Sequence, residues 1–471
     1  MALTQTAYSG RIAALASMAG LALSISACDV VSGIFGGTPE PDKAVAPSTY
    51  GSACLESYGS GVSSIAATAD GGREYYISTE LPSNVDKNAW GRDSRAVYEY
   101  DVKLGRVRPI ASTWNSEVVI EPYATVDVLR PTPIRPVQIA EKLEQVQVGA
   151  DGNRIVLAVS RKNLAGGLAS LYSGNVPPIG ASASLRPGDG GGLAVVKLND
   201  DLNQEAIQTF SLSPDGNKLA AIVGDLSELR GYDLEADKIL VYSLGTDNAI
   251  VVSNELPTPA TSIEIDRKPA ITANGAQLIW APDSTKLAYA TALGIGGWAV
   301  QILDFATGKP TLVHAFENTT QPQIAWAGDG ASLFVVTTAN STSESFGDTS
   351  IHHLTAAKDG KTIGGVGIIK RQANWKTVPS FVTLVGENVL LFTWEKHVFR
   401  FTAEGGDLTK ATFEPLTEHY PRDVKVLPLP IYGSAAADRA VFSISAPGIG
   451  NRVGVYTHLS SAKCPVPTPK E

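Results

Sequence analysis

Short apolar runs alternate with turn-forming residues through most of the chain. The runs are rich in Val, Ile, Leu and Tyr, and each starts four or five residues after an aspartate. Runs of this length, bounded by Gly, Pro and Asp, are typical of β-strands rather than helices. Five of them are Tyr75–Ile77, Ile155–Val159, Leu219–Val223, Leu287–Ala290 and Leu333–Val336. The pattern predicts strands that follow tight turns.

The turns share a motif that recurs without gaps. Its aspartates are Asp70, Asp151, Asp215, Asp283 and Asp329, and four of the five copies carry Arg or Lys three residues later. The clearest copy reads Ser-Pro-Asp-Gly-Asn-Lys over residues 213–218. Pro restricts φ, Asp accepts bonds from nearby amides, and Gly takes positive φ without strain. Each copy predicts a hairpin turn, and weaker copies lie at Val385–Asn388 and Ala436–Arg439.

Two further strands follow each hairpin. After Asp215 they are Lys238–Ser243 and Ala249–Val252, and after Asp283 they are Ala299–Leu303 and Thr311–Val313. Four-stranded units that repeat in this way are typical of an all-β propeller. We expect seven four-stranded blades, with six or eight as the alternatives.

The motif resembles the WD-repeat-like propeller repeat of TolB-type translocation proteins and of prolyl oligopeptidases. The resemblance covers most of residues 62–460 and is strongest over residues 215–338. It implies a propeller, an architecture that serves both binding scaffolds and enzymes. The chain lacks the Gly-x-Ser-x-Gly motif of a hydrolase domain, so no catalytic serine is implied. Asp29–Gly61 is too short for the α/β domain of TolB, so the partners of TolB are not implied either.

The N-terminal segment has the layout of a secretory signal. Arg11 precedes an apolar run, Ile12–Ala27, which ends in Ile-Ser-Ala followed by Cys28. This ending resembles the lipobox of bacterial lipoproteins, which implies cleavage before Cys28 and a thioether-linked diacylglycerol on Cys28, with palmitate among the acyl chains. The alternative is an uncleaved signal anchor. The expected location is the extracytoplasmic side of the cell envelope, with the choice between inner and outer membrane left open.

These features divide the chain into four parts: a signal peptide over residues 1–27, a flexible tether over 28–53, the propeller over 54–464 and a Pro-rich tail over 465–471. Cys54 and Cys464 then lie at the two ends of the propeller. Because a propeller joins its first and last blades, we expect these cysteines to form a disulfide near the seam. Two unpaired thiols are the alternative.

Charge and composition restrict the partners. The formal net charge is −9, which disfavours nucleic acid. No zinc-type Cys/His spacing, phosphate-binding loop or dinucleotide fingerprint occurs, so neither a metal nor a cofactor is expected. The adjacent His352 and His353 would point to opposite faces of a strand and would not share one ion.

Three groups of residues allow two interpretations each. Trp280 and Trp326 stand at equivalent motif positions and fit core packing better than a ligand platform, because aliphatic residues replace them elsewhere. The basic series fits solvated turn positions better than an anion-binding ring. It consists of Arg73, Arg154, Lys218 and Lys286. Asn163–Gly192 and Ser341–Thr349 are expected to be loops, either without a role or forming a binding rim.

The expected function is therefore a membrane-anchored, non-enzymatic propeller scaffold that binds an envelope protein or a cell-wall component. The alternative is a propeller enzyme of the quinoprotein, lactonase or glycan-cleaving kind, with its site at the axial mouth.

Overall fold

The aspartate motifs form the turns between the two innermost strands of successive sheets. The computed structural model describes residues 43–44, 48–49, 54–80, 95–112, 141–161, 169–176, 183–184, 193–196, 205–225, 236–244, 250–257, 278–293, 297–340, 346–372, 375–418, 420, 423–448 and 450–460. Every regular element within these ranges is a strand. None of the described residues forms a helix long and apolar enough to cross a membrane.

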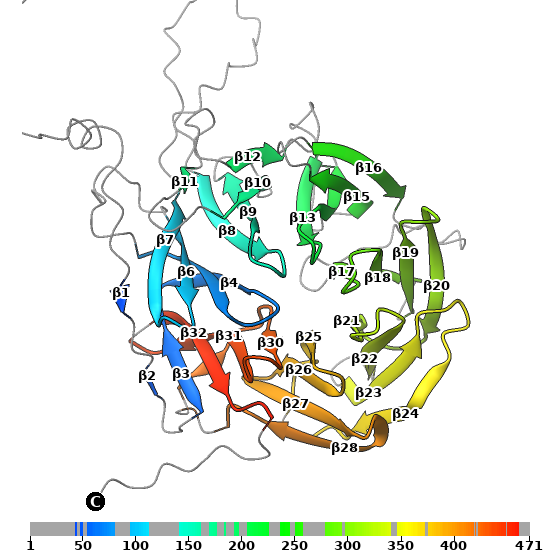
Figure 1. Ribbon diagram of the computed structural model, residues 1–471. Helices are drawn as coiled ribbons and strands as arrows, with labels where there is room; N and C mark the ends of the chain where they lie inside the picture. Colours follow the sequence, from blue (N-terminus) through cyan, green and yellow to red (C-terminus); the bar gives the residue numbers. More distant parts are fainter. Residues whose placement is uncertain are drawn as a thin grey trace, which may run out of the picture. The chain divides into compact units, whose positions relative to one another are not determined.

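Seven sheets are arranged around a central axis, and they are numbered here as blades in chain order (Figure 1). Blade 1 contains β4 (Val62–Ala67), β5 (Arg73–Ser78), β6 (Ala96–Asp101) and β7 (Arg106–Ser112). Blade 2 contains β8 (Glu141–Val148), β9 (Arg154–Arg161), β10 (Ala169–Asn175) and β12 (Leu193–Val196). Blade 3 contains β13 (Glu205–Leu212), β14 (Lys218–Asp225), β15 (Ala236–Leu244) and β16 (Ile250–Pro257).

The next three blades repeat the same antiparallel order. Blade 4 contains β17 (Leu278–Trp280), β18 (Lys286–Ala292), β19 (Trp298–Asp304) and β20 (Lys309–Phe316). Blade 5 contains β21 (Gln323–Trp326), β22 (Ser332–Asn340), β23 (Phe346–Thr355) and β24 (Thr362–Ile369). Blade 6 contains β25 (Ser380–Val385), β26 (Val389–Trp394), β27 (His397–Glu404) and β28 (Asp407–Pro415). The predicted all-β propeller with seven blades is confirmed.

Blade 7 joins the two ends of the propeller. Its C-terminal strands are β29 (Lys425–Val426), β30 (Tyr432–Ser434), β31 (Arg439–Ala446) and β32 (Gly450–Thr457). The N-terminal strand β3 (Leu55–Tyr58) pairs with β32, with Leu55 opposite Tyr456. One end of the chain therefore completes the sheet of the other.

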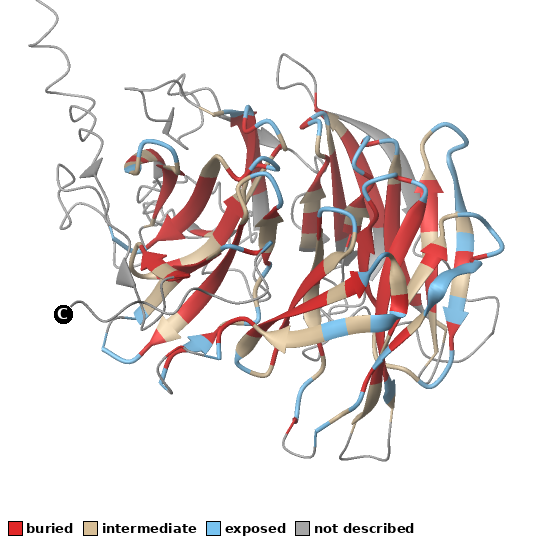
Figure 2. Cartoon of the chain, turned by 60° about the horizontal axis from the view of Figure 1, so that its bottom comes forward, coloured by how far each residue is buried: buried red, intermediate tan, exposed pale blue. Residues whose placement is uncertain are grey.

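Each blade is apolar on both faces, which explains why its second strand reads as an unbroken apolar run. On β14, Leu219 and Ala221 pack against blade 2, whereas Ala220 and Ile222 pack against blade 4. Seven buried clusters result, one at each junction between neighbouring blades. Figure 2 shows these buried residues running through the blades, with exposed residues at turns and outer edges. Burial between sheets is thus the main stabilising contribution.

Three segments differ from the expected organisation. The expected loop Asn163–Gly192 contains β10, the third strand of blade 2, because Leu171 and Tyr172 bury their side chains between blades. It also contains β11 (Ala183–Ser184), which pairs with β7 of blade 1. The expected loop Ser341–Thr349 ends in the first residues of β23. Within the expected tether, β1 (Lys43–Ala44) pairs with β7, and β2 (Ser48–Thr49) pairs with β3.

Candidate functional site

The motif aspartates organise their turns as the sequence predicts. In each of the five turns, the aspartate Oδ1 accepts a hydrogen bond from the backbone amide two residues later, over 2.8–3.0 Å. Bonds from the Thr68 hydroxyl and the Gly72 amide lower the pKa of Asp70. Bonds from the Thr285 amide and hydroxyl likewise lower the pKa of Asp283. These carboxylates therefore have a structural role in the turns.

The basic residues that follow the aspartates connect neighbouring blades. Arg73 Nη2 donates to the backbone oxygen of Asp151 over 2.5 Å, and Lys218 Nζ donates to that of Ser284 over 3.0 Å. Lys286 Nζ reaches the backbone oxygen of Gly330 over 3.3 Å. Each contact runs from one motif turn to the next. The expectation that this series is merely solvated is therefore wrong for these three residues.

At two of the turns, a glycine leaves room for the basic side chain of the preceding motif, Arg73 or Arg154. Gly152 has φ +71°, and a Cβ there would lie 2.5 Å from Arg73 Nη2. Gly216 has φ +70°, and a Cβ there would lie 2.8 Å from the Cβ of Arg154. Backbone bonds reinforce the connection, with Ala150 N donating to the Pro214 oxygen over 2.8 Å. We call this set of linked motif turns the turn ring.

A cavity of about 450 Å³ lies where the innermost strands meet at the axis. Its wall takes residues from blades 2 to 7, and Pro214 and Pro282 place it next to the turn ring. The innermost strands surround the axis in Figure 1. Five aromatic residues are among those that line it: Phe210, Trp280, Trp326, Phe381 and Tyr432. We call this the axial cavity.

The two tryptophans are buried, as expected for core packing. Trp280 is 6% exposed and Trp326 is 5% exposed. Their indole N–H groups donate to backbone oxygens of the preceding blade, Trp280 to Ser211 over 2.9 Å and Trp326 to Ile279 over 2.8 Å. The same residues therefore pack the core, connect blades and line the axial cavity.

Gln147 links blades 2 and 3 in a similar way. Its Nε2 donates to the Phe210 oxygen over 2.8 Å, and its Oε1 accepts from the Leu212 amide over 2.7 Å. Both ends of this amide are engaged with the backbone. The side-chain amide of Gln147 is thus turned toward the blades.

Phe381 has an unusual backbone conformation. It has φ +55°, in the left-handed region that bulky residues rarely adopt. It lies where the pairing of β25 with β26 shifts register, and its amide donates to Gln323 Oε1 of blade 5 over 3.0 Å. Such bulges redirect side chains and are frequent next to functional sites. The sequence carries no signal for it, because Ser380–Val385 reads as an ordinary strand.

No Asp, Glu, His, Lys or Arg belongs to the wall of the axial cavity as the structure describes it. Besides the indole N–H groups of Trp280 and Trp326, its side-chain polar groups are the amide of Gln147 and the hydroxyls of Thr209, Ser211, Thr383 and Tyr432. Burial raises the pKa of Tyr432 to about 12, so its phenol is neutral at physiological pH. The cavity therefore offers an uncharged environment.

The two adjacent histidines lie apart from the axial cavity and point to opposite faces of β23. His353 stacks on Phe334 with ring centroids 4.2 Å apart and contacts the Ser332 hydroxyl over 2.9 Å. His352 packs against Phe316 of blade 4, and burial lowers its pKa to about 4. Within the described ranges, no three His, Cys, Asp or Glu side chains are grouped to hold a metal.

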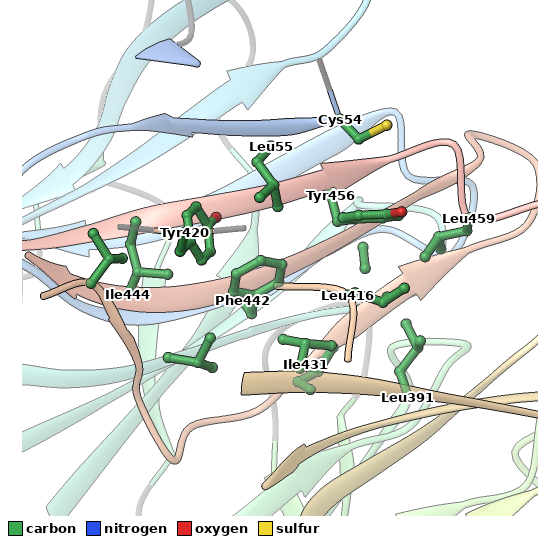
Figure 3. Close-up of a cluster of buried hydrophobic side chains, with 14 of the residues drawn as sticks. Cys54, Leu55, Leu391, Leu416, Tyr420, Ile431, Phe442, Ile444, Tyr456 and Leu459 are labelled. Carbon is green, nitrogen blue, oxygen red and sulfur yellow. The ribbon is translucent and has the colours of Figure 1, made fainter. Parts of the chain in front are cut away.

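The cysteine predictions fall partly outside the described residues. Cys28 and Cys464 both lie there, together with the rest of the signal segment and the tail. Cys54 is fully buried beside Leu55 and Tyr456, in the apolar cluster at the junction between blades 6 and 7 (Figure 3). Lipidation of Cys28 and pairing of Cys54 with Cys464 stay predictions.

Comparison with known proteins assigns no family. Neither a family model nor a curated protein matches the chain. The periplasmic gluconolactonase PpgL of Pseudomonas aeruginosa is similar at TM-score 0.42 and 14% identity, over 75% of this chain and 84% of that one. The WD40 repeats of RRP9 are similar at TM-score 0.44 and 8% identity, over 88% of this chain and 99% of that one. A prolyl endopeptidase gives TM-score 0.43 and 16% identity, over 67% of this chain and 40% of its own.

Proposed function

We propose that this chain is a lipid-anchored propeller of the bacterial cell envelope that binds an envelope protein or a cell-wall component and performs no chemistry itself. The axial cavity carries the proposal. Its wall is collected from six blades, and the side chains that form it are uncharged. Concave sites of this kind, with an apolar wall and a few polar groups, are typical binding sites.

The membrane anchor rests on the N-terminal sequence. The Ile-Ser-Ala-Cys ending at Cys28 is what supports lipidation there. Two or more acyl chains would hold the propeller at a membrane stably, because each buried methylene contributes about 0.8 kcal/mol. The anchor would keep the axial cavity within reach of a partner in the same envelope layer.

Crosslinking in whole cells tests both parts of this function. The full-length chain, its Cys28→Ala variant and two Thr→Trp variants would be purified after crosslinking, and the recovered proteins and glycans would be identified by mass spectrometry. Thr383→Trp places an indole in the axial cavity, whereas Thr362→Trp places one on the exposed start of β24. We expect a specific partner with the wild type and Thr362→Trp, and its loss with Thr383→Trp.

Two results would contradict the proposal. One is recovery of the same partner by wild type and Thr383→Trp, with circular dichroism showing both folded. The other is recovery of no partner that distinguishes the wild type from an unrelated lipoprotein. Cys28→Ala separates the anchor from the binding site, because it should release the protein from membranes while purified protein still binds.

A further inference from the structure

We infer that a groove on the outside of the propeller, between blades 5 and 6, binds an extended segment of a partner polypeptide as an added β-strand. A cavity of about 440 Å³ lies there, lined by residues of β24, β27 and β28 and by Trp375. The outer strands β24 and β28 lie side by side in Figure 1. We call this cavity the outer groove. It shares no lining residue with the axial cavity, so it is a second binding surface beyond the proposed function.

The first observation is a free strand edge. Within the described part of the chain, β24 pairs with β23 alone, so the other edge of its backbone has no strand partner there. The pairing is regular over Val366–Ile369, and it is preceded by an irregularity that contains Gly364 and Gly365, both at positive φ. Thr362 lies beyond this irregularity and outside the groove. A strand edge presents N–H and C=O groups at a spacing that another extended polypeptide matches.

The second observation is that β24 lacks the residues that normally protect an outer strand. Proline and charged side chains on an edge strand discourage pairing with another chain. The outer strands β16, β20 and β28 each contain a proline and at least one charged residue, whereas β24 contains neither. In blades 1 and 7 the outer strands are covered, because β1 and β11 pair with β7 and β2 pairs with β3. Among the described outer strands of blades 3 to 6, β24 is therefore the least protected.

The third observation concerns the side chains beside this edge. Phe401 and Leu408 are buried and form the floor of the outer groove, so they shape it but offer little surface. The accessible apolar surface comes from Ile368, which is 57% exposed, and from Ala411 and Phe413, which are partly exposed on the β28 side. An aliphatic side chain of an added strand would cover these residues, which is favourable because apolar surface leaves water. The mixture of backbone groups and apolar side chains fits a peptide strand.

The charge of the groove favours a partner segment that carries a carboxylate. Lys370 is the only charged residue among those that line the outer groove. Its Nζ lies 2.6 Å from Asp348 Oδ2, but both side chains are exposed, and such surface pairs contribute little. Asp348 also accepts the backbone amide of Arg371 over 3.0 Å, so it keeps a donor if Lys370 turns to the partner. The expected segment therefore has aliphatic side chains on one face and an acidic residue beside them.

Three synthetic peptides test the inference on the purified full-length chain. The first is acetyl-Asp-Thr-Leu-Thr-Leu-Thr-Asp-amide, which has its Leu and Asp side chains on one face of an extended strand. Its two Asp residues bring a carboxylate to Lys370 in either strand direction. The second peptide is N-methylated at every Leu and Thr amide, and the third has Lys in place of both Asp. Saturation-transfer NMR and calorimetry at pH 7 should show that the first peptide binds at least about ten-fold more tightly than the other two.

Two variants locate the binding. Ile368→Glu places a negative charge beside the free edge of β24, and Ala411→Trp fills the outer groove from β28. Each should weaken binding of the first peptide about ten-fold or more. Leu312→Glu is the matched control, because Leu312 is 48% exposed on β20, the outer strand of blade 4. This control should leave binding unchanged, and circular dichroism would establish that all three variants are folded.

Three results would overturn the inference. The first is equal binding of the N-methylated peptide or of the Lys peptide, which would exclude strand pairing or the role of the carboxylate. The second is full binding of the first peptide by both folded groove variants. The third is a dimer of the wild type in sedimentation velocity that Ile368→Glu dissociates, because a second copy would then occupy the edge. A monomeric wild type that selects the first peptide supports the inference, whichever partner the axial cavity binds.

Discussion

Lys218 Nζ of blade 3 donates to the backbone oxygen of Ser284 in blade 4 over 3.0 Å. The same serine is engaged a second time, because its hydroxyl accepts the backbone amide of Asp215 over 3.0 Å. Ser284 is 1% exposed and has φ +59°. One buried serine therefore accepts two hydrogen bonds from the preceding motif, one from the backbone amide of Asp215 and one from the side chain of Lys218.

Removing the Ser284 hydroxyl should destabilise the propeller. Ser284→Ala leaves the Asp215 amide without its acceptor, and we expect a loss of about 1–2 kcal/mol in the free energy of unfolding. Ser284→Gly loses the same bond but adopts positive φ without strain. Urea unfolding should therefore show that Ser284→Gly is more stable than Ser284→Ala. The opposite order would show that strain at positive φ does not set the difference between the two variants, and unchanged stability of Ser284→Ala would refute the contribution of the hydroxyl bond.

Removing the charge of Lys218 should weaken the turn ring. Lys218→Met keeps most of the aliphatic stem but loses the hydrogen bond to Ser284. We expect this loss to lower the free energy of unfolding by about 1 kcal/mol. Lys309→Met is the control, because Lys309 is exposed in the turn end of β20. The control should change the free energy of unfolding by less than about 0.5 kcal/mol. Equal effects would argue against the inter-blade role of Lys218.

A buried ion pair connects blades 1 and 7. Arg439 Nη2 lies 2.6 Å from Glu74 Oε1, and Tyr58 donates to the same carboxylate. At pH 8, Arg439→Ala would leave Glu74 buried without its counter-charge, which typically costs about 3–5 kcal/mol. The exposed Arg106→Ala should have almost no effect. Thermal and urea unfolding at pH 8 would measure the stability of both variants. A decrease of less than about 1 kcal/mol in the free energy of unfolding of Arg439→Ala would contradict the prediction.

Stability should depend on pH through Glu74. Burial raises its pKa from 4.5 to about 7, against the opposing effect of Arg439. The folded state then binds the proton more tightly than the unfolded state, so this group's contribution to stability is greatest below about pH 4.5 and is lost as pH rises to 7. The free energy of unfolding of the wild type should exceed that of Glu74→Gln by more at pH 5 than at pH 8. A difference that does not change with pH would refute this.

The comparison with Glu74→Gln is needed because His352 acts in the opposite direction. Burial lowers its pKa to about 4, so its contribution to stability falls as pH drops from 6.5 toward 4. That effect is common to wild type and variant and cancels in their difference.

Cys54 and Cys464 should form a disulfide. The Thr457 amide donates to the Cys54 oxygen over 2.9 Å, and Cys464 follows Thr457 by seven residues, a distance that an extended chain spans easily. Peptide mapping of the exported protein without reductant should find the linked peptides. Cys464→Ser should lower the free energy of unfolding by about 2–5 kcal/mol. Free thiols at both positions would refute the pairing.

The repeated hairpins could be predicted because their interactions are local. Asp215 accepts the amide of Asn217 and the hydroxyl of Ser213, all within one turn. Strand β10 was harder to recognise, since its neighbours in sequence are rich in Gly and Pro. Only burial of Leu171 and Tyr172 between blades makes it a strand.

The axial cavity could not be predicted from the pattern of apolar residues. Gln147, Trp280 and Phe381 come from three blades and share no motif. The conformation of Phe381 depends on Gln323, which lies 58 positions earlier in the chain. No local rule connects such a pair.

The sequence by itself determined the hairpin turns and most of the strands, and it favoured seven repeats, because each of these features depends on side chains a few residues apart. The tertiary structure alone decided that Arg73, Lys218 and Lys286 bind backbone oxygens of the next blade, that β3 completes blade 7, and that the axis holds an uncharged cavity. The physical reason is that these contacts join residues brought together only by closure of the ring. The spacing of a repeat in the sequence shows which residue recurs in each motif. It does not show which backbone oxygen of the next blade that residue contacts.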